Sequence, residues 1–233
     1  MAILSLDHVK MTSILEKAIS VIAPFRCIVC GNYNNVICTA CTHTMQRLEA
    51  PLCILCGAPS QAWELCHSHN SPLAGIYAAG AYDDILKALI TQFKFEHARA
   101  AYKPLAVFLA GALPHFDNEW IIVAIPTIPA HIRQRSYDHA ALLAGEVARV
   151  KGLERIRALA RRHDARQVGA SRQQRAVRAR EAFTIRGEVA GKKVLIIDDV
   201  CTTGATLQSA AATLRAAGAA EVWGAVAAWQ PPK

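Results

Sequence analysis

Apolar residues in the last two thirds of the chain follow two alternating patterns, which are short uninterrupted runs and repeats at helical spacing. The uninterrupted runs predict strands buried on both faces, and they span residues 76–81, 120–125, 194–197 and 222–228. The segments between them predict helices, and these span residues 85–93, 100–112, 136–152 and 207–214. Strands that alternate with helices are typical of a parallel α/β sheet, in which ligands bind at the carboxyl ends of the strands.

The first third of the chain departs from this alternation. Apolar residues at helical spacing predict a short amphipathic helix within residues 1–24. Charged residues interrupt that segment, so it lacks the apolar core of an export signal. No run elsewhere is long enough to span a membrane. We therefore expect a cytoplasmic protein that does not insert into a membrane.

Cysteine is concentrated in one short segment. Seven of the eight cysteines lie between residues 27 and 66, which predicts a domain boundary soon afterwards. In a reducing compartment, clustered cysteines are better interpreted as metal ligands than as disulfides. They form pairs with two residues between the members, and a histidine completes the last pair. The eight predicted ligands are Cys27, Cys30, Cys38, Cys41, Cys53, Cys56, Cys66 and His69.

These four pairs have the spacing of zinc knuckles. Two pairs close a tetrahedron around Zn²⁺, and Gly31 and Gly57 can supply the positive φ that each tight turn needs. Sequential pairing gives two ribbons, while interleaved pairing and His67 in place of His69 stay open as alternatives. Eight ligands for two zinc ions leave no open coordination position, so we expect both ions to be structural. Residues 25–72 are then a double zinc ribbon.

The most specific motif follows the apolar run at residues 194–197 and reads D-D-V-C-T-T-G-A-T over residues 198–206. Backbone N–H groups at a helix N-terminus, together with threonine hydroxyls and a glycine, form a cradle for a phosphate monoester. The expected phosphate contacts are Cys201, Thr202, Thr203, Gly204, Ala205 and Thr206. Cys201 is either a redox-sensitive thiol or a small space-filling residue.

Two adjacent carboxylates would repel that phosphate. We therefore expect Asp198 and Asp199 to face vicinal ribose hydroxyls or a hydrated Mg²⁺, so that a ribose 5-phosphate satisfies the whole motif. The alternative is a capped turn with two solvated acids. A second strand end, at residues 125–129, contains two prolines and leads to Arg133 and Arg135, whose guanidinium groups can bind an anion through paired hydrogen bonds.

The D-D-V-C-T-T-G-A-T run resembles the ribose-phosphate signature of type I phosphoribosyltransferases, and residues 125–139 resemble the diphosphate loop of that family. Together with the zinc pairs, both motifs resemble the ComF family (ComFC), the competence-associated phosphoribosyltransferase-like proteins. The resemblance covers nearly the whole chain. It implies a type I phosphoribosyltransferase-like parallel sheet flanked by helices over residues 73–233, behind a small N-terminal zinc-ribbon module.

The resemblance also implies a function in nucleotide metabolism and DNA uptake. It implies Mg²⁺-dependent binding of 5-phosphoribosyl-1-diphosphate (PRPP) and phosphoribosyl transfer to an unidentified acceptor, with Asp198 and Asp199 as catalytic residues. A mobile loop would contribute Gln167 and Arg175. The implied diphosphate contacts are Pro126, Thr127, Arg133 and Arg135. The residues expected to form a hood over the acceptor, or else part of the core, are Tyr77, Tyr82, Phe93, Lys94 and Phe95.

The chain departs from the family pattern at several positions, and two alternatives without turnover stay open. Tyr137, Asp138 and His139 stand where Phe, Asn and Gln are usual, while Ala165 replaces a Thr and Arg178 an Asn. The changes at Ala165 and Arg178 favour a regulator that binds PRPP without turnover. The other alternative is a non-catalytic competence accessory factor, with single-stranded DNA and a helicase as the partners that the resemblance implies.

Charge is unevenly distributed along the chain. The net charge is +8, and residues 151–180 contain ten Lys and Arg against two acids, so this stretch holds the entire excess. It would give a salt-dependent affinity for a phosphate backbone, although the absence of aromatic residues from it disfavours base stacking. A substrate loop, a nucleic-acid contact and a solvated face all stay open.

Overall fold

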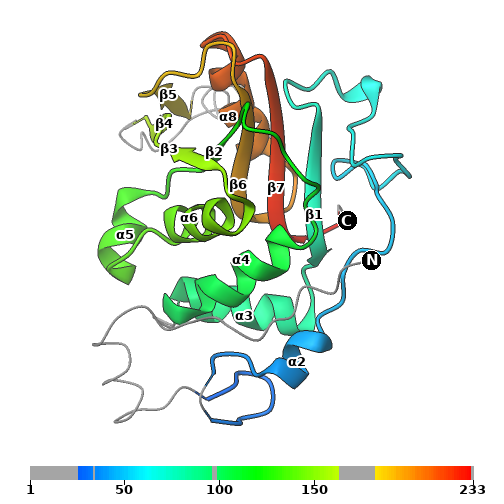
Figure 1. Cartoon of the computed structure of the whole chain (residues 1–233), viewed down its shortest axis with the longest axis vertical. Helices are drawn as coiled ribbons and strands as arrows, with labels where there is room; N and C mark the ends of the chain where they lie inside the picture. Colours follow the sequence, from blue (N-terminus) through cyan, green and yellow to red (C-terminus); the bar gives the residue numbers. More distant parts are fainter. Residues whose placement is uncertain (1–25, 34, 96–98, 163–181, 232–233) are drawn as a thin grey trace, which may run out of the picture.

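A five-stranded parallel sheet forms the centre of the protein in the computed structural model, which describes residues 26–33, 35–95, 99–162 and 182–231 (Figure 1). The strand order is β1-β7-β6-β2-β3, and all four pairings are parallel. The strands are β1 (Gly75–Ala81), β2 (Trp120–Ala124), β3 (Glu154–Ile156), β6 (Lys193–Cys201) and β7 (Glu221–Trp229). The α/β parallel sheet predicted from the sequence is confirmed.

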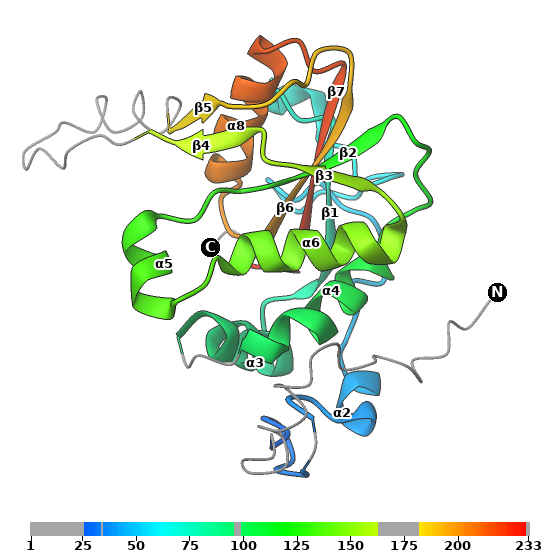
Figure 2. The same cartoon turned by 60° about the vertical axis from the view of Figure 1, so that its left-hand side comes forward.

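Helices cover both faces of this sheet (Figure 2). One face carries α3 (Asp84–Phe95), the short η2 (Arg99–Ala101), α4 (Tyr102–Ala110) and α6 (His139–Lys151), and the other carries α8 (Ala205–Ala216). Successive residues of β6 therefore enter different cores: Leu195 joins the cluster with α3, α4 and α6, and Ile196 joins the cluster with α8. Burial on both faces explains why the strand reads as a continuous apolar run. Among the described helices, none is both long and apolar enough to cross a membrane.

The structure corrects several element boundaries. The turn expected after β2 contains a short helix, α5 (Pro129–Arg135), because the fixed φ of Pro129 suits a first helical turn. The helix expected from residue 136 begins at His139, since the Asp138 side chain caps it by accepting from the Ala141 N–H at 3.1 Å. β6 was expected to end at residue 197 but continues to Cys201, so the acidic pair lies on the strand itself.

A small antiparallel pair, β4 (Leu159–Arg161) and β5 (Phe183–Ile185), was not predicted, because strands of three residues have too few positions to show an alternation. Residues 163–181, which come shortly after β4 in the sequence, lie outside the part of the chain that the structure describes. Gln167, Arg175 and much of the basic stretch thus lie outside the described residues, as does the helix predicted within residues 1–24.

The cysteine-rich segment divides between the two cores. Its first half contains α2 (Thr39–His43) and joins the cluster formed with α3, α4 and α6. Its second half contains the 3₁₀ turn η1 (His67–His69) and joins the cluster formed with α8. Figure 1 shows the first half, in blue, near α3 and the second half, in cyan, beside β1. The two halves therefore contact different parts of the α/β domain.

Candidate functional site

The carboxyl ends of β2 and β6 lie next to each other. Ala124 and Ile197 are the last partners of the β2–β6 ladder, and β6 then continues to Cys201 beside β7. Pro126, which has no N–H to donate, follows the end of β2. Because β2 and β6 are neighbours in the sheet, Asp198 and Asp199 lie beside the loop that leaves β2. This is the edge at which a parallel sheet binds ligands.

Asp199 is buried and held between two basic side chains. Its relative exposure is 2%, Lys94 Nζ of α3 lies 2.7 Å from one carboxylate oxygen, and His139 Nε2 of α6 lies 3.1 Å from the other. The side chain points to the same face as Leu195 and Ile197, as the alternation of a strand requires. Burial raises the pKa of Asp199, but His139 and Lys94 outweigh it and lower the pKa below its usual value. Asp199 is therefore a fixed anion.

Asp198 has a different environment because it points to the opposite face of β6. It is partly buried, and its carboxylate accepts the backbone N–H of Asp199 at 2.9 Å. Burial and then the charge of Asp199 raise the pKa of Asp198 to about 7, although Lys94 and Arg161 act in the opposite direction. The two carboxylates are thus unequal, since the pKa of Asp198 lies near neutrality and that of Asp199 lies below its usual value.

A hydrogen-bonded chain orients His139. Arg135 Nη1 lies 3.0 Å from His139 Nδ1, and since a guanidinium can only donate, Nδ1 accepts and Nε2 carries the proton toward Asp199. The Thr127 hydroxyl donates to Asp138 at 2.7 Å, which ties the loop after β2 to the start of α6. Arg135 is buried in this arrangement, whereas Arg133 is exposed on α5. Their binding of a diphosphate stays a prediction.

The loop between β6 and α8 has the features expected of a phosphate cradle. The three threonines of residues 202–206 and Ala205 are exposed, while Gly204 is buried with a φ of 71° just before the twelve-residue α8. Burial and the charge of Asp198 raise the pKa of the Cys201 thiol to about 12. Cys201 therefore fits the space-filling alternative better than the redox-sensitive one.

Lys94 and His139 are site residues whose roles the sequence did not reveal. The sequence places Lys94 in a possible acceptor hood and marks His139 only as a departure from a family pattern, because neither residue is near Asp199 in the sequence. Among the other expected hood residues, Phe93 is fully buried and stacks on Tyr137, and Tyr77 stacks on Trp223. Both aromatic rings pack as core residues do.

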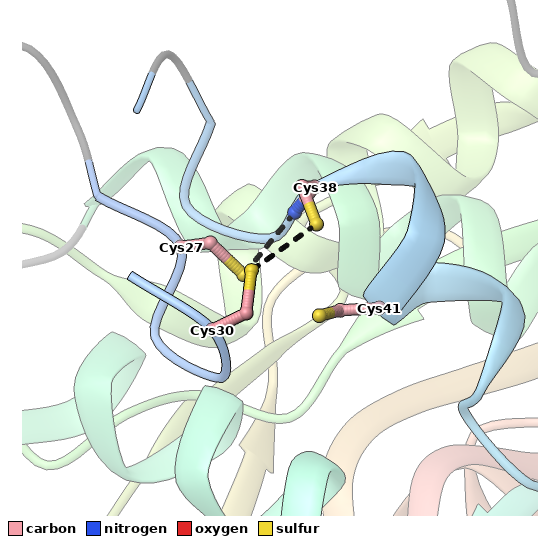
Figure 3. Close-up of side chains that lie close together, drawn as sticks. All are labelled: Cys27, Cys30, Cys38 and Cys41. Atoms are coloured by element: carbon pink, nitrogen blue, oxygen red, sulfur yellow. Dashed lines mark hydrogen bonds between the residues drawn. The ribbon is translucent and has the colours of Figure 1, made fainter. Parts of the chain in front are cut away.

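The eight predicted metal ligands come together in two groups, and the grouping is the sequential one. Figure 3 shows the four cysteine side chains of the first group converging, Cys27 and Cys30 from a turn of the chain and Cys38 and Cys41 from the start of α2. The Sγ atoms of Cys30 and Cys38 are 3.6 Å apart, and those of Cys56 and Cys66 are 3.7 Å apart. A tetrahedral site with Zn–S bonds of about 2.3 Å requires a separation of about 3.8 Å between sulfurs, so both groups have the dimensions of a zinc site.

Each group combines a thiol of lowered pKa with one of raised pKa. Burial and the neighbouring cysteines raise the pKa of Cys41 to about 12, and hydrogen bonds with Cys53 and Cys56 raise the pKa of Cys66 to about 11. Burial raises the pKa of Cys27, but backbone N–H groups, chiefly those of Cys30 and Cys38, outweigh it and lower the pKa to about 6. The same combination lowers the pKa of Cys53 to about 6. His69 Nε2 is buried without a hydrogen-bond partner in the described part of the chain, as a ligand nitrogen must be, whereas His67 is exposed. These groups support structural zinc.

Lys94→Met is expected to lower the free energy of unfolding by about 2–4 kcal/mol, because it leaves the buried Asp199 carboxylate without its nearest cation. Lys193→Met is the matched control, since its ammonium pairs at 2.6 Å with an exposed carboxylate, Glu119, and should cost less than about 1 kcal/mol. Urea denaturation of the three proteins measures both losses. Equal losses would contradict the burial of the Lys94–Asp199 pair.

Two family models and several curated proteins match the chain. A double zinc ribbon domain matches residues 18–69, and a phosphoribosyl transferase domain matches residues 138–232. Competence protein F of Haemophilus influenzae is 30% identical over 86% of this chain and 96% of its own length. Competence protein ComFC of Streptococcus pneumoniae is 26% identical over 84% and 96%, and the DNA utilization protein YhgH of Salmonella typhi is 28% identical over 80% and 88%. The chain, with its zinc ribbons and phosphoribosyltransferase-like sheet, belongs to the ComF family.

Proposed function

We propose that this protein binds PRPP together with Mg²⁺ at the carboxyl ends of β2 and β6, and transfers its phosphoribosyl group to an acceptor. One observation supports this most directly: a single strand end combines two unequal carboxylates with an exposed threonine loop at a helix N-terminus. The loop suits a 5-phosphate, and the carboxylates suit the hydroxyls and the cation that accompany the ribose.

The described residues suggest how PRPP would lie. Its 5-phosphate would occupy the loop of residues 202–206, its ribose would face Asp198, and its diphosphate would reach toward the exposed Arg133. Asp198 fits a role beside Mg²⁺, because the residue is only partly buried and its carboxyl has a raised pKa that a nearby cation would lower. Asp199 fits a supporting role, because Lys94 and His139 already contact its two oxygens.

Transfer would require stabilisation of opposite charges at once. Loss of diphosphate leaves positive character at the anomeric carbon, which the Asp198 carboxylate would stabilise directly and the buried Asp199 anion through its charge. Arg133 would stabilise the negative charge of the leaving group. Mg²⁺, when bound, would neutralise part of the same diphosphate charge. No side chain has to form a covalent bond with the ribose in this scheme.

Calorimetric titration of Mg²⁺ and PRPP into the zinc-replete protein tests this function. Saturable binding with one PRPP per chain is expected, and no detectable binding would overturn the proposal. Release of diphosphate in the presence of candidate nucleobases then separates transfer from PRPP sensing, since a sensing regulator binds PRPP without releasing diphosphate.

A role in DNA uptake is the second function that we propose, because the relatives are named as competence and DNA utilization proteins. The structure describes the start of the basic stretch, residues 151–162. This part carries positive charge beside the sheet, at Lys151, Arg155, Arg157, Arg161 and Arg162. Single-stranded DNA and a helicase of the competence machinery are the proposed partners.

Substitution of Arg172, Arg175 and Arg178 by alanine should weaken binding of a labelled oligonucleotide several-fold at low salt, since each arginine that contacts a phosphate adds to the salt-dependent affinity. Fluorescence anisotropy at low and high salt measures this effect. Binding that is equal in both proteins would exclude these residues from the DNA contact.

A further inference from the structure

The two zinc ribbons begin with nearly the same sequence but have different surroundings. Residues 27–31 read C-I-V-C-G and residues 53–57 read C-I-L-C-G, so the only difference is Val29 in place of Leu55. In the first ribbon Val29 is 44% exposed, and a Cβ added to Gly31 would meet no described atom within 4 Å. In the second ribbon the corresponding residues pack against the α/β domain.

The second knuckle, residues 53–57, is attached to the carboxyl end of β7. Ile54 is completely buried, and its backbone carbonyl accepts a hydrogen bond from Trp229 Nε1 at 2.9 Å. The ring of the same tryptophan lies 3.7 Å from the position that a Cβ on Gly57 would take. Trp229 is the β7 partner of Cys201, the residue that precedes the phosphate loop. The knuckle therefore lies where β6 ends and the phosphate loop begins.

Leu55 contacts the phosphate loop directly. Its Cδ2 methyl is the nearest atom to the position that a Cβ on Gly204 would occupy, and the two would overlap. Cys201 Sγ lies 3.8 Å from that position. Gly204 has a φ of 71°, which favours glycine, and it is enclosed between a zinc knuckle and the end of β6. The leucine side chain thus occupies the space next to the turn from which α8 begins.

This contact bears on anion binding because the loop must present its N–H groups and hydroxyls in one fixed arrangement. Thr202 and Thr203, immediately before Gly204, and Thr206, two residues after it, are exposed and receive little support from packing of their own. A binding loop that is held in its bound shape before the ligand arrives loses less conformational entropy on binding. Packing of Leu55 on Gly204 supplies such support from outside the loop.

We infer that Leu55 is a positioning residue for the 5-phosphate of the ligand, and that the second zinc ribbon, unlike the first, is part of the phosphate-binding structure. This inference rests on the proposed binding of PRPP. It assigns different roles to two ribbons of nearly identical sequence: the first contacts the α3–α4 side of the fold, and the second holds the phosphate loop.

Leu55→Ala tests the inference, with Val29→Ala as the matched control at the equivalent position of the first ribbon. Ribose 5-phosphate and inorganic diphosphate are titrated separately, because Leu55 contacts the loop proposed for the 5-phosphate, whereas the diphosphate is proposed to lie toward Arg133. Leu55→Ala should weaken the affinity for ribose 5-phosphate and PRPP about tenfold and leave the affinity for diphosphate unchanged. Leu55→Met, which restores the volume, should recover affinity to within about twofold of wild type.

Zinc content is measured on every variant and should equal that of wild type. Equal affinities of Leu55→Ala and Val29→Ala for ribose 5-phosphate would overturn the inference. An equal loss of affinity for ribose 5-phosphate and diphosphate would also overturn it, since that result indicates general damage to the fold. Failure of the wild-type protein to bind PRPP at all would instead overturn the proposed function on which the inference rests.

Discussion

Replacing Asp198 and Asp199 together with asparagine is expected to weaken the binding of PRPP in the presence of Mg²⁺ by more than about 100-fold. Loss of a hydrogen bond to a charged group costs about 1.5–3 kcal/mol. Asp198→Asn would remove one such contact with the ligand, and Asp199→Asn would remove the carboxylate that pairs with Lys94 behind the site. Two such losses correspond to at least about two orders of magnitude in affinity. The effect should be large because both carboxylates are at the strand end where the phosphate loop begins. Calorimetric titration of wild type and variant at pH 7.5 gives the comparison.

The matched control removes the same charge from an exposed site. Asp117→Asn with Glu119→Gln changes two carboxylates just before β2, which are 60% and 69% exposed and pair only with Lys193 among the described residues. This control should bind PRPP as wild type does. Binding by the Asp198/Asp199 variant within about threefold of wild type would contradict the proposed site. A tenfold change in affinity corresponds to about 1.4 kcal/mol, so a threefold change is less than the loss of one charged hydrogen bond.

The single variants separate binding from folding. The folded protein disfavours the carboxylate form of Asp198, because its pKa is raised to about 7. Asp198 therefore lowers stability as the pH rises from the pKa of an unfolded aspartate, about 4, toward 7. Asp198→Asn should consequently be at least as stable as wild type at pH 8, so weaker PRPP binding by this variant cannot be attributed to unfolding. Asp199→Asn should be destabilised, since it leaves Lys94 without its carboxylate partner.

Cys30→Ser and Cys56→Ser are each expected to remove one zinc ion per chain and to lower the melting temperature by about 10 °C or more. Both cysteines are exposed, so the substitutions leave no cavity and act through the metal. Structural zinc contributes directly to folding free energy, and a loss of several kcal/mol lowers the melting temperature of a chain of this size by about 2–4 °C per kcal/mol. Metal analysis and thermal unfolding measure the two effects.

Cys201→Ala is the control for this pair, because Cys201 is a buried cysteine outside both ligand groups. It should keep the zinc content of wild type. Full zinc content in Cys56→Ser would contradict the ligand group of Cys53, Cys56, Cys66 and His69, and would favour a set that includes His67. If the second ribbon supports the phosphate loop, Cys56→Ser should also lose PRPP affinity that Cys30→Ser keeps.

Short-range patterns in the sequence determined the framework of this protein. The apolar runs predicted the long strands β1, β2, β6 and β7, because a strand buried on both faces has no polar position to interrupt it. The spacing of the cysteines predicted two groups of four ligands, because two intervening residues place both members of a pair on one tight turn. The D-D-V-C-T-T-G-A-T run placed a strand end, a glycine turn and a helix start within nine residues.

Tertiary structure decided how these parts are used. Asp198 and Asp199 are neighbours in sequence, yet β6 directs them to opposite faces, and only packing brings Lys94 and His139 to Asp199. Val29 and Leu55 occupy equivalent positions in two similar knuckles, yet only Leu55 reaches Gly204. Periodicity and spacing report on residues within one element, whereas partners from separate elements are set by how those elements pack. For that reason the sequence predicted which residues group as metal ligands and which form the acidic motif, but it did not predict which side chains contact the acidic pair.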